Sequence, residues 1–424
     1  MRLFNMMGRK PIRRICISLV TIALCVASPA LSRMVQTVLA ERALHQQRVE
    51  AAIGWLDSIP QWNRDGKTHL LYAKAYRKQG KFELVRTQLQ AAFDDGVSVE
   101  LLEREQWLTQ ARAGQMGEAE PHFRQLLEDP RDDGQDICEC FVTGYLLNYQ
   151  FSRAAPVLAA WEAEFPTDPR PHELKGSWLQ DSEQWSAAVE SYEKALGLNP
   201  GNTRIRCDMA VCLTELHDYD KAKVRFQQCL RETPDDSQLL IQWNEWLLLN
   251  GQMDEARAIL QKVLNLSPAN QDARFAMAKT QLMDGAAETA VQTLEQLQKE
   301  NPYSTPIKYS LASALQASGM TERASEMFKQ VRSSEETLRR KQQLVDSLLK
   351  SPNQPDVRYE IAMISMSHES PVEGLRWLLS VVDLNPEHAA AHEALADYYH
   401  GIGKVELEEK HRRLAETFAN HKTE

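Results

Sequence analysis

The sequence predicts an all-α protein built from stacked helix-turn-helix hairpins, and three observations lead to this fold class. Its 424 residues contain only 18 glycines and 18 prolines, whereas straight-chain residues, which lose little rotamer freedom in helices, are abundant. A short motif returns at a nearly constant interval through most of the chain. Around each copy, apolar residues recur three and four positions apart, as expected of amphipathic helices.

Residues 1–33 are predicted to be a targeting segment. Residues 1–14 carry five basic side chains and no acidic one, and the stretch 15–31 carries no charge. This pattern is typical of a cleaved export signal, and its length also suits a retained transmembrane anchor. Positive charges ahead of the apolar stretch favour a location outside the cytoplasm. We therefore expect an exported protein of the cell envelope, periplasmic or otherwise extracytoplasmic, which is anchored to the inner membrane if the segment stays uncleaved.

The net charge disfavours one class of partner. Lys and Arg total 49 and Asp and Glu total 59, so the formal net charge is −10. Because residues 1–30 hold five basic residues and no acidic one, the remainder carries about −15 by subtraction. Such a surface repels a phosphate backbone, and no nucleic-acid partner is expected.

The repeated motif runs Gly-x-aromatic-x-x-Ala in its fullest form, and its last position fixes the period. That position is Val85 in the first copy and Ala119 in the second, a step of 34. The next six copies follow after one step of 35 and then steps of 34, and they end at Ala154, Ala188, Ala222, Ala256, Ala290 and Ala324. A further step of 50 reaches Gly374, and another of 34 reaches Glu408. Such regularity indicates one structural unit stacked many times.

Each motif position has a physical reason. Glycine between the two helices suits a helix end that needs a positive φ; these residues are Gly80, Gly114, Gly251, Gly285, Gly319 and Gly403. The alanine allows two helix backbones to approach closely, where a larger side chain would overpack the contact. Proline at the twelfth position after the alanine stops the second helix; these residues are Pro166, Pro200, Pro234, Pro268 and Pro302.

The repeat resembles the tetratricopeptide repeat (TPR), most clearly over residues 172–202. Gly176 matches the small residue of the first helix. The second helix and its stop match at Trp185, Ala188, Tyr192, Ala195 and Pro200. The resemblance implies a right-handed superhelix of about ten stacked hairpins.

The spacing divides the chain into segments. Residues 34–65 are expected to form capping or linker helices, 66–334 to hold repeats one to eight, and 355–424 to hold repeats nine and ten. The step of 50 exceeds the usual step by sixteen, so 335–354 is predicted to be a helical insert that bends or interrupts the superhelix.

No catalytic motif is present in the sequence. It has neither a complete Gly-rich phosphate loop nor a Gly-x-Ser-x-Gly elbow. Acidic pairs are common, as on any solvated helix face. We therefore predict a protein that is not an enzyme and needs no cofactor.

One stretch has the spacing C-x4-C-x4-H-x11-C, which suggests a metal site. The period offers another interpretation, because Cys229 lies one full period after Ala195, in a small buried position. Cys212 suits close packing in the first helix. We expect Cys207 to face the groove and His217 to lie in the turn, giving four separate environments and no metal. A Cys212–Cys229 disulfide is the alternative in an oxidising compartment.

Two further patterns are weaker metal candidates. In EHAAAHE, His388 and His392 lie four apart on one helical face and His400 lies two turns further, but the H-E-x-x-H motif is absent. We interpret these as exposed histidines of the last repeat. Cys138 and Cys140 are two apart, so on a helix they point about 200° from each other.

The TPR resemblance implies a binding groove lined by the first helices. The predicted partner-binding residues are Lys74, Arg77, Glu173, Ser177, Glu245, Phe275, Lys279, Tyr309 and Tyr359. Phe275, Tyr309 and Tyr359 occupy the same place in successive repeats and predict an aromatic strip for an apolar or proline-bearing segment. Packing between neighbouring first helices is the alternative interpretation.

The predicted function follows from the groove. We expect a non-enzymatic scaffold or adaptor of the cell envelope that binds a peptide or partner protein. The alternative is a regulatory or assembly factor attached to an envelope enzyme, with or without a metal dependence. The matching groove positions hold no Asn, which disfavours the carboxylate clamp that the family uses for chaperone tails.

Overall fold

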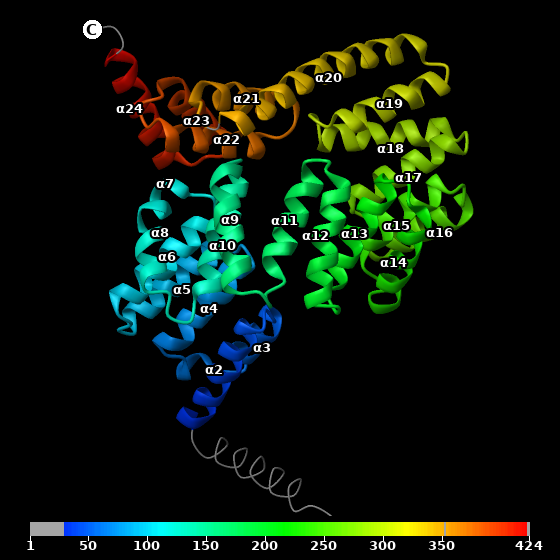
Figure 1. The fold of residues 1–424 in the computed structure, drawn as a ribbon. Helices are drawn as coiled ribbons and strands as arrows, with labels where there is room; N and C mark the ends of the chain where they lie inside the picture. The colour runs from blue at the N-terminus through cyan, green and yellow to red at the C-terminus, as the bar shows by residue number, and fades with distance from the viewer. Residues whose placement is uncertain (1–28, 352, 422–424) are drawn as a thin grey trace, which may run out of the picture. The chain divides into compact units, whose positions relative to one another are not determined.

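The computed structural model describes residues 29–351 and 353–421, and every regular element in these ranges is a helix. The predicted all-α class is therefore confirmed. Residues 1–28, which hold most of the predicted targeting segment, lie outside the described residues. None of the described helices combines the length and apolar character that crossing a membrane requires. The chain forms two compact units, one ending at Gly144 and one beginning at Tyr145 (Figure 1).

The first unit begins with a helical hairpin that packs on the first repeat. Its helices α2 (Pro29–His45) and α3 (Val49–Asp57) share a buried apolar cluster with α4 (Gly66–Lys78). The remaining elements are η1 (Gln61–Asn63), α5 (Phe82–Asp94), α6 (Val99–Arg112), α7 (Met116–Ala119), η2 (Glu120–His122), α8 (Phe123–Glu128) and the larger part of α9 (Gly134–Leu147).

The second unit is a stack of helical hairpins. Its helices are α10 (Phe151–Glu164), α11 (Arg170–Asp181), α12 (Trp185–Leu198), α13 (Thr203–Glu215), α14 (Tyr219–Glu232), α15 (Ser237–Leu249), α16 (Met253–Leu266), α17 (Gln271–Met283), α18 (Ala287–Glu300), α19 (Thr305–Ala317), α20 (Thr321–Lys350), α21 (Pro355–His368), α22 (Pro371–Leu384), α23 (Ala389–Gly401) and α24 (Val405–His421). Buried side chains of consecutive hairpins join into shared clusters, so each hairpin covers the apolar face of the next.

The turns between paired helices have the backbone that the sequence predicts. All six turn glycines adopt a positive φ, between 69° and 80°. Where a repeat has no glycine, Tyr149, Glu183 and His217 take this conformation with φ of 54°, 56° and 61°. The side chains of these three residues make this backbone less favourable than it is for glycine. The predicted place of His217 in the turn is confirmed.

The small residues lie where helices approach closely. The predicted alanines of the second helices are buried, from Ala119 to Ala324. At Gly374 even a methyl group would not fit, because an added Cβ would overlap Cγ of Met366 and lie 2.9 Å from the carbonyl oxygen of Ala362. The second helices also end before the predicted prolines, as α12 does at Leu198 before Pro200.

Helix α20 is twice as long as its neighbours. It runs without a break for 30 residues, which corresponds to about 45 Å at 1.5 Å per residue. The helical part of the predicted insert at 335–354 therefore continues the second helix of its hairpin. Near its end, Leu344 and Leu348 are buried in one cluster with α21 and α22.

The beginning of the second unit contacts its last third. The buried Arg358 of α21 donates a hydrogen bond from Nη1 to the carbonyl oxygen of Asn148, with 2.7 Å between the atoms. The adjacent Tyr149 packs against Trp377 of α22. The hairpins of this unit thus come back to their starting point, as the path from α10 to α22 shows (Figure 1).

Candidate functional site

Three consecutive first helices of the second unit form a pocket of about 350 Å³. We call this cavity the groove pocket. It lies over α13, α15 and α17, with Phe226 of α14 contributing to its wall. The lining residues are Val211, Thr214, Glu215, Phe226, Gln238, Ile241, Gln242, Glu245, Leu249, Asp272, Phe275, Ala276 and Lys279.

The period explains why these side chains meet. Val211, Glu245 and Lys279 follow one another at steps of one period, so they occupy one position in three successive repeats. Ile241 and Phe275 are related by the same step. Stacked identical hairpins present equivalent positions to one continuous surface.

The groove pocket combines an apolar wall with an acidic rim. Ile241 and Ala276 are buried, and Phe275 packs partly against the next hairpin. Glu215, Glu245 and Asp272 carry three negative charges against one positive charge on Lys279, so the lining residues sum to −2. The site therefore favours a ligand with apolar side chains and positive charge.

Lys279 has only weak contacts in the groove pocket. Its Nζ lies 3.9 Å from Oε1 of Glu245 and 5.8 Å from the centroid of the Phe275 ring. Both charged side chains are well exposed, at 41 % for Lys279 and 59 % for Glu245. Exposed ion pairs of this kind contribute little stability, so a ligand can replace this contact at low cost.

The structure brings together three of the nine predicted binding residues, which are Glu245, Phe275 and Lys279. Two others, Lys74 and Arg77, lie on α4 in the first unit. Lys74 pairs with Asp133 at 3.0 Å. Arg77 is fully buried, and its Nε donates to Oε1 of Glu105 at 2.6 Å. Arg77 is therefore not available to a partner in this structure.

The two predicted residues of α11 lie outside the groove pocket. Glu173 accepts a hydrogen bond from Nδ2 of Asn202 at 2.7 Å and lies 3.7 Å from Nη2 of Arg204. Ser177, one turn further along the helix, is half-buried. Glu173 thus contributes to the contact between α11 and the start of the next repeat.

The predicted aromatic strip is divided among three surroundings. Phe275 lines the groove pocket. Tyr309 on α19 is 53 % exposed and meets Phe328 edge-on, with 5.9 Å between ring centroids. Tyr359 on α21 is half-buried in the last apolar cluster, and its ring centroid lies 5.1 Å from that of His388. Burial raises the pKa of Tyr359.

Several lining residues were not predicted from the sequence. Glu215 and Asp272 supply two of the three acidic side chains of the rim. The period relates them to other residues of the pocket. Asp272 occupies the same repeat position as Gln238, and Glu215 occupies the same repeat position as Leu249. Applying the step to every groove position, and not only to aromatic and basic residues, would have defined the pocket.

The cysteine-rich stretch differs from the prediction at Cys207. Cys212 and Cys229 are buried as expected, and burial raises the pKa of Cys212 to about 12. Cys207, however, is also buried and does not face the groove. A hydrogen bond between the thiols of Cys207 and Cys229 raises the pKa of Cys207 and lowers that of Cys229. The expected four separate environments are therefore wrong, because the repeat packs these two thiols together. All three cysteines are free thiols.

The interpretation of the late histidines as exposed is wrong for His392. Its ring is buried, Nδ1 lies 2.9 Å from Nδ1 of His411, and Nε2 lies 2.8 Å from the carbonyl oxygen of Pro386. His388 instead caps α23 by accepting a hydrogen bond from the Ala391 amide. Within residues 29–351 and 353–421, no group of three or more His, Cys, Asp or Glu side chains could hold a metal ion.

Comparison with known proteins gives a family match for part of the chain. The tetratricopeptide repeat family model matches residues 179–240 and 247–304. These ranges include all of α13 and α17 and both ends of α15, which are the helices under the groove pocket. A comparison with curated protein sequences finds no match.

Solved structures give low overall similarity. A tetratricopeptide repeat protein from Parabacteroides merdae ATCC 43184 is 17 % identical, with a TM-score of 0.38 over 64 % of this chain and 97 % of that one. YrrB, described as a TPR protein with an unusual peptide-binding site, is 17 % identical, with a TM-score of 0.29 over 49 % and 98 %. An IFIT1 monomeric mutant with Gppp-AAAA is 13 % identical, with a TM-score of 0.43 over 82 % and 90 %. The family match thus identifies tetratricopeptide repeats in residues 179–240 and 247–304, within a chain whose described residues form stacked helical hairpins of constant period.

Proposed function

We propose that this protein is a non-catalytic scaffold of the cell envelope that binds an extended peptide segment of a partner protein in the groove pocket. The observation that carries the proposal is the meeting of an apolar wall and an acidic rim at equivalent positions of three repeats. Tetratricopeptide repeats generally serve as protein-interaction scaffolds. The sequence also has no catalytic motif, which favours a scaffold over an enzyme.

The partner segment is apolar and basic in this proposal. The cavity of about 350 Å³ falls within the usual size range of ligand pockets. Phe275 and Ile241 would contact apolar side chains of the segment. Glu245 and Asp272 would attract the Lys or Arg residues that flank those apolar side chains. Lys279 would then leave Glu245 and pair with an acidic or carbonyl oxygen of the segment.

The location outside the cytoplasm rests on the predicted targeting segment. Residues 1–33 have the charge and apolar pattern of an export signal or anchor. A fusion of residues 1–33 to a reporter enzyme that is active only outside the cytoplasm tests this part. An inactive but intact fusion would contradict the envelope location and would leave the groove proposal standing.

A peptide titration tests the binding site directly. The probes are a fluorescent peptide with alternating Leu and Lys and its counterpart with Glu in place of Lys. Wild-type protein is expected to bind the Leu/Lys peptide, and the Glu245→Lys/Asp272→Lys variant to bind it at least about tenfold more weakly, because it reverses two rim charges.

The control reverses two exposed charges on a second helix outside the groove. The Asp254→Lys/Glu255→Lys variant changes the net charge by the same amount on α16. Long-range electrostatics from the changed net charge will weaken its binding of the Leu/Lys peptide to some extent. Beyond that loss, its affinity is expected to stay within about twofold of wild type. Equal losses in both variants, or equal binding of the two peptides, would exclude a specific site in the groove pocket.

A further inference from the structure

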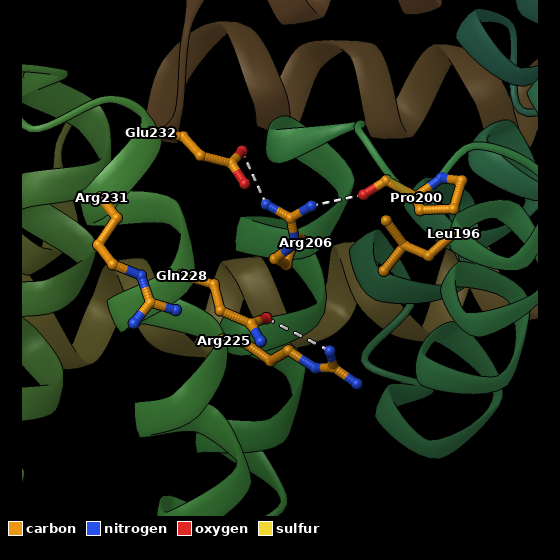
Figure 2. Close-up of a pocket in the computed structure, with 7 residues that line it drawn as sticks. All are labelled: Leu196, Pro200, Arg206, Arg225, Gln228, Arg231 and Glu232. Carbon is orange, nitrogen blue, oxygen red and sulfur yellow. Dashed lines mark hydrogen bonds and ion pairs between the residues drawn. The ribbon is translucent and has the colours of Figure 1, made fainter.

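A second pocket of about 450 Å³ lies beside the second helices of two repeats (Figure 2). We call it the arginine pocket. It shares no lining residue with the groove pocket. Its lining residues come from α12, the turn after it, the start of α13 and α14, and are Leu196, Pro200, Arg206, Arg225, Gln228, Arg231 and Glu232.

Arg206 is the fixed arginine of this pocket. It lies near the start of α13 with only 8 % of its surface exposed. Its Nη1 lies 2.9 Å from Oε2 of Glu232, and its Nη2 donates to the carbonyl oxygen of Pro200 at 2.5 Å. Figure 2 shows the guanidinium held between these two acceptors. Glu232 therefore neutralises Arg206 and fixes its orientation.

The other two arginines are poorly partnered. Arg225 donates to Oε1 of Gln228 over a long 3.4 Å, and Figure 2 shows its side chain running along the lower edge of the site. Within the described residues, neither Arg225 nor Arg231 forms an ion pair with a carboxylate. Both guanidinium groups keep donors for a ligand, since each carries five N–H groups in a planar fork.

The charge of the pocket is opposite to that of the protein. Three arginines and one glutamate sum to +2 among the lining residues, whereas the whole chain carries −10. A phosphate monoester is a dianion near neutral pH and accepts several charge-assisted hydrogen bonds from arginine. Leu196 and Pro200 add an apolar wall for the carbon part of such a ligand.

We propose that the arginine pocket binds a phosphate monoester group through Arg225 and Arg231, while Arg206 forms a fixed wall of the pocket. The group is carried by a small phosphorylated molecule or by a phosphorylated residue of a protein. This inference goes beyond the peptide scaffold, because it assigns a second ligand class to a separate surface. Occupation would give the two arginines of α14 the charge-assisted partners that they lack in the free protein.

Calorimetric titration at fixed ionic strength tests the proposal. The probes are inorganic phosphate, a phosphoserine peptide and the same peptide with Glu in place of phosphoserine. Wild-type protein is expected to bind at least one phosphate probe saturably, and Arg225→Gln/Arg231→Gln to weaken this binding at least about tenfold. A phosphoserine peptide about tenfold tighter than inorganic phosphate identifies a phosphoprotein, and the reverse order identifies a small phosphorylated molecule.

The matched control removes two positive charges from the same helix outside the pocket. Lys221→Gln/Lys223→Gln lowers the net charge equally, and neither lysine lines the arginine pocket. This variant is expected to bind the phosphate probe within about twofold of wild type. Equal losses in the two double variants, no saturable binding of either phosphate probe, or a Glu peptide as tight as the phosphoserine peptide would each overturn the proposal.

Discussion

The ring of Tyr149 stacks on the ring of Trp377, with 3.9 Å between their centroids and 7° between their planes. The two residues are far apart in the sequence and belong to the turn before α10 and to α22. The Tyr149 hydroxyl also donates to Glu373. Burial, followed by the charge of Glu373, raises the pKa of Tyr149. The hydroxyl therefore stays protonated and remains a donor at neutral pH.

Removing this stack should loosen the second unit. Tyr149→Ala is expected to lower the free energy of unfolding by about 2–4 kcal/mol, because it deletes a large aromatic contact and the bond to Glu373. It should also raise the radius of gyration in small-angle X-ray scattering. The control Tyr309→Ala, at a ring that is 53 % exposed, should cost less than about 1 kcal/mol. Equal losses of unfolding free energy in the two variants would show that the Tyr149–Trp377 stack contributes no more than an exposed tyrosine does.

The buried histidine pair should make the last hairpin sensitive to acid. Burial, then the neighbouring charges of His392 and Lys410, lower the pKa of His411 to about 4. The pKa of His392 is also lowered, mainly by burial. In the unfolded chain a histidine titrates near pH ~6.5, so below this pH the unfolded state takes up protons that the folded state does not. The free energy of unfolding should thus fall as the pH drops from about 6.5 towards 4.

Chemical denaturation at pH 7.5, 6 and 5 measures this slope. Each unit of pKa difference is worth about 1.4 kcal/mol, so the loss over this range should be on the order of 1–2 kcal/mol. His411→Gln keeps a donor for His392 and should flatten the slope. His400→Gln changes an exposed ring that contacts Glu408 and should leave it unchanged. An identical slope in all three proteins would mean that other groups determine the acid sensitivity.

Gly374 should not tolerate a methyl group. The added Cβ of Gly374→Ala would overlap the Cγ of Met366 and lie 2.9 Å from a backbone oxygen. Because α22 packs tightly on α21 here, we expect a loss of about 1–3 kcal/mol in unfolding free energy. The added Cβ of Gly197→Ala in α12 meets nothing within 4 Å, so this change should stabilise by up to about 1 kcal/mol. Thermal unfolding measures the stability change in both variants. A change of the same sign in the two would contradict the prediction.

Arg77 should matter for folding. Arg77→Met leaves Glu105, which is almost fully buried, without its closest ion-pair partner. Breaking a buried pair in this way typically costs about 3–5 kcal/mol. The double variant Arg77→Met/Glu105→Leu should recover much of the loss, because the charge that Arg77→Met leaves unpaired on Glu105 is also removed. Arg86→Met removes one side of an exposed pair with Glu83 and should change stability by less than about 0.5 kcal/mol. Unfolding by denaturant measures all three, and a neutral Arg77→Met variant would contradict the structural role.

The sequence predicted the repeat architecture well because every repeat uses the same few contacts. Glycine at the turn, alanine at the crossing and proline at the stop are each required by local backbone geometry. Such requirements act within one hairpin, and a fixed period makes them visible in a single chain. The groove positions Glu245, Phe275 and Lys279 follow from the same regularity.

What the sequence did not predict depends on side-chain direction and on contacts between elements. Arg77 was expected in the groove as a long cation, yet an acidic neighbour on α6 holds it inside the stack. His392 looked exposed because its partner His411 lies on the following helix. Cys207 and Cys229 meet across one hairpin, and the periodic pattern does not reveal which face each thiol takes.

The hydrogen bond from Arg358 to Asn148 changes how the second unit can come apart. An open solenoid frays from its ends, one hairpin after another. Here the segment Asn148–Tyr149, before α10, is joined to α21 and α22. The hairpins between these points form a closed stack, so one of them cannot unfold without straining the contacts that hold the two ends together. Among the described elements, α23 and α24 alone lie beyond this joint towards the C-terminus, and they also hold the histidine pair. Acid should therefore detach the C-terminal hairpin first and leave a closed ring of helices that unfolds as one cooperative block.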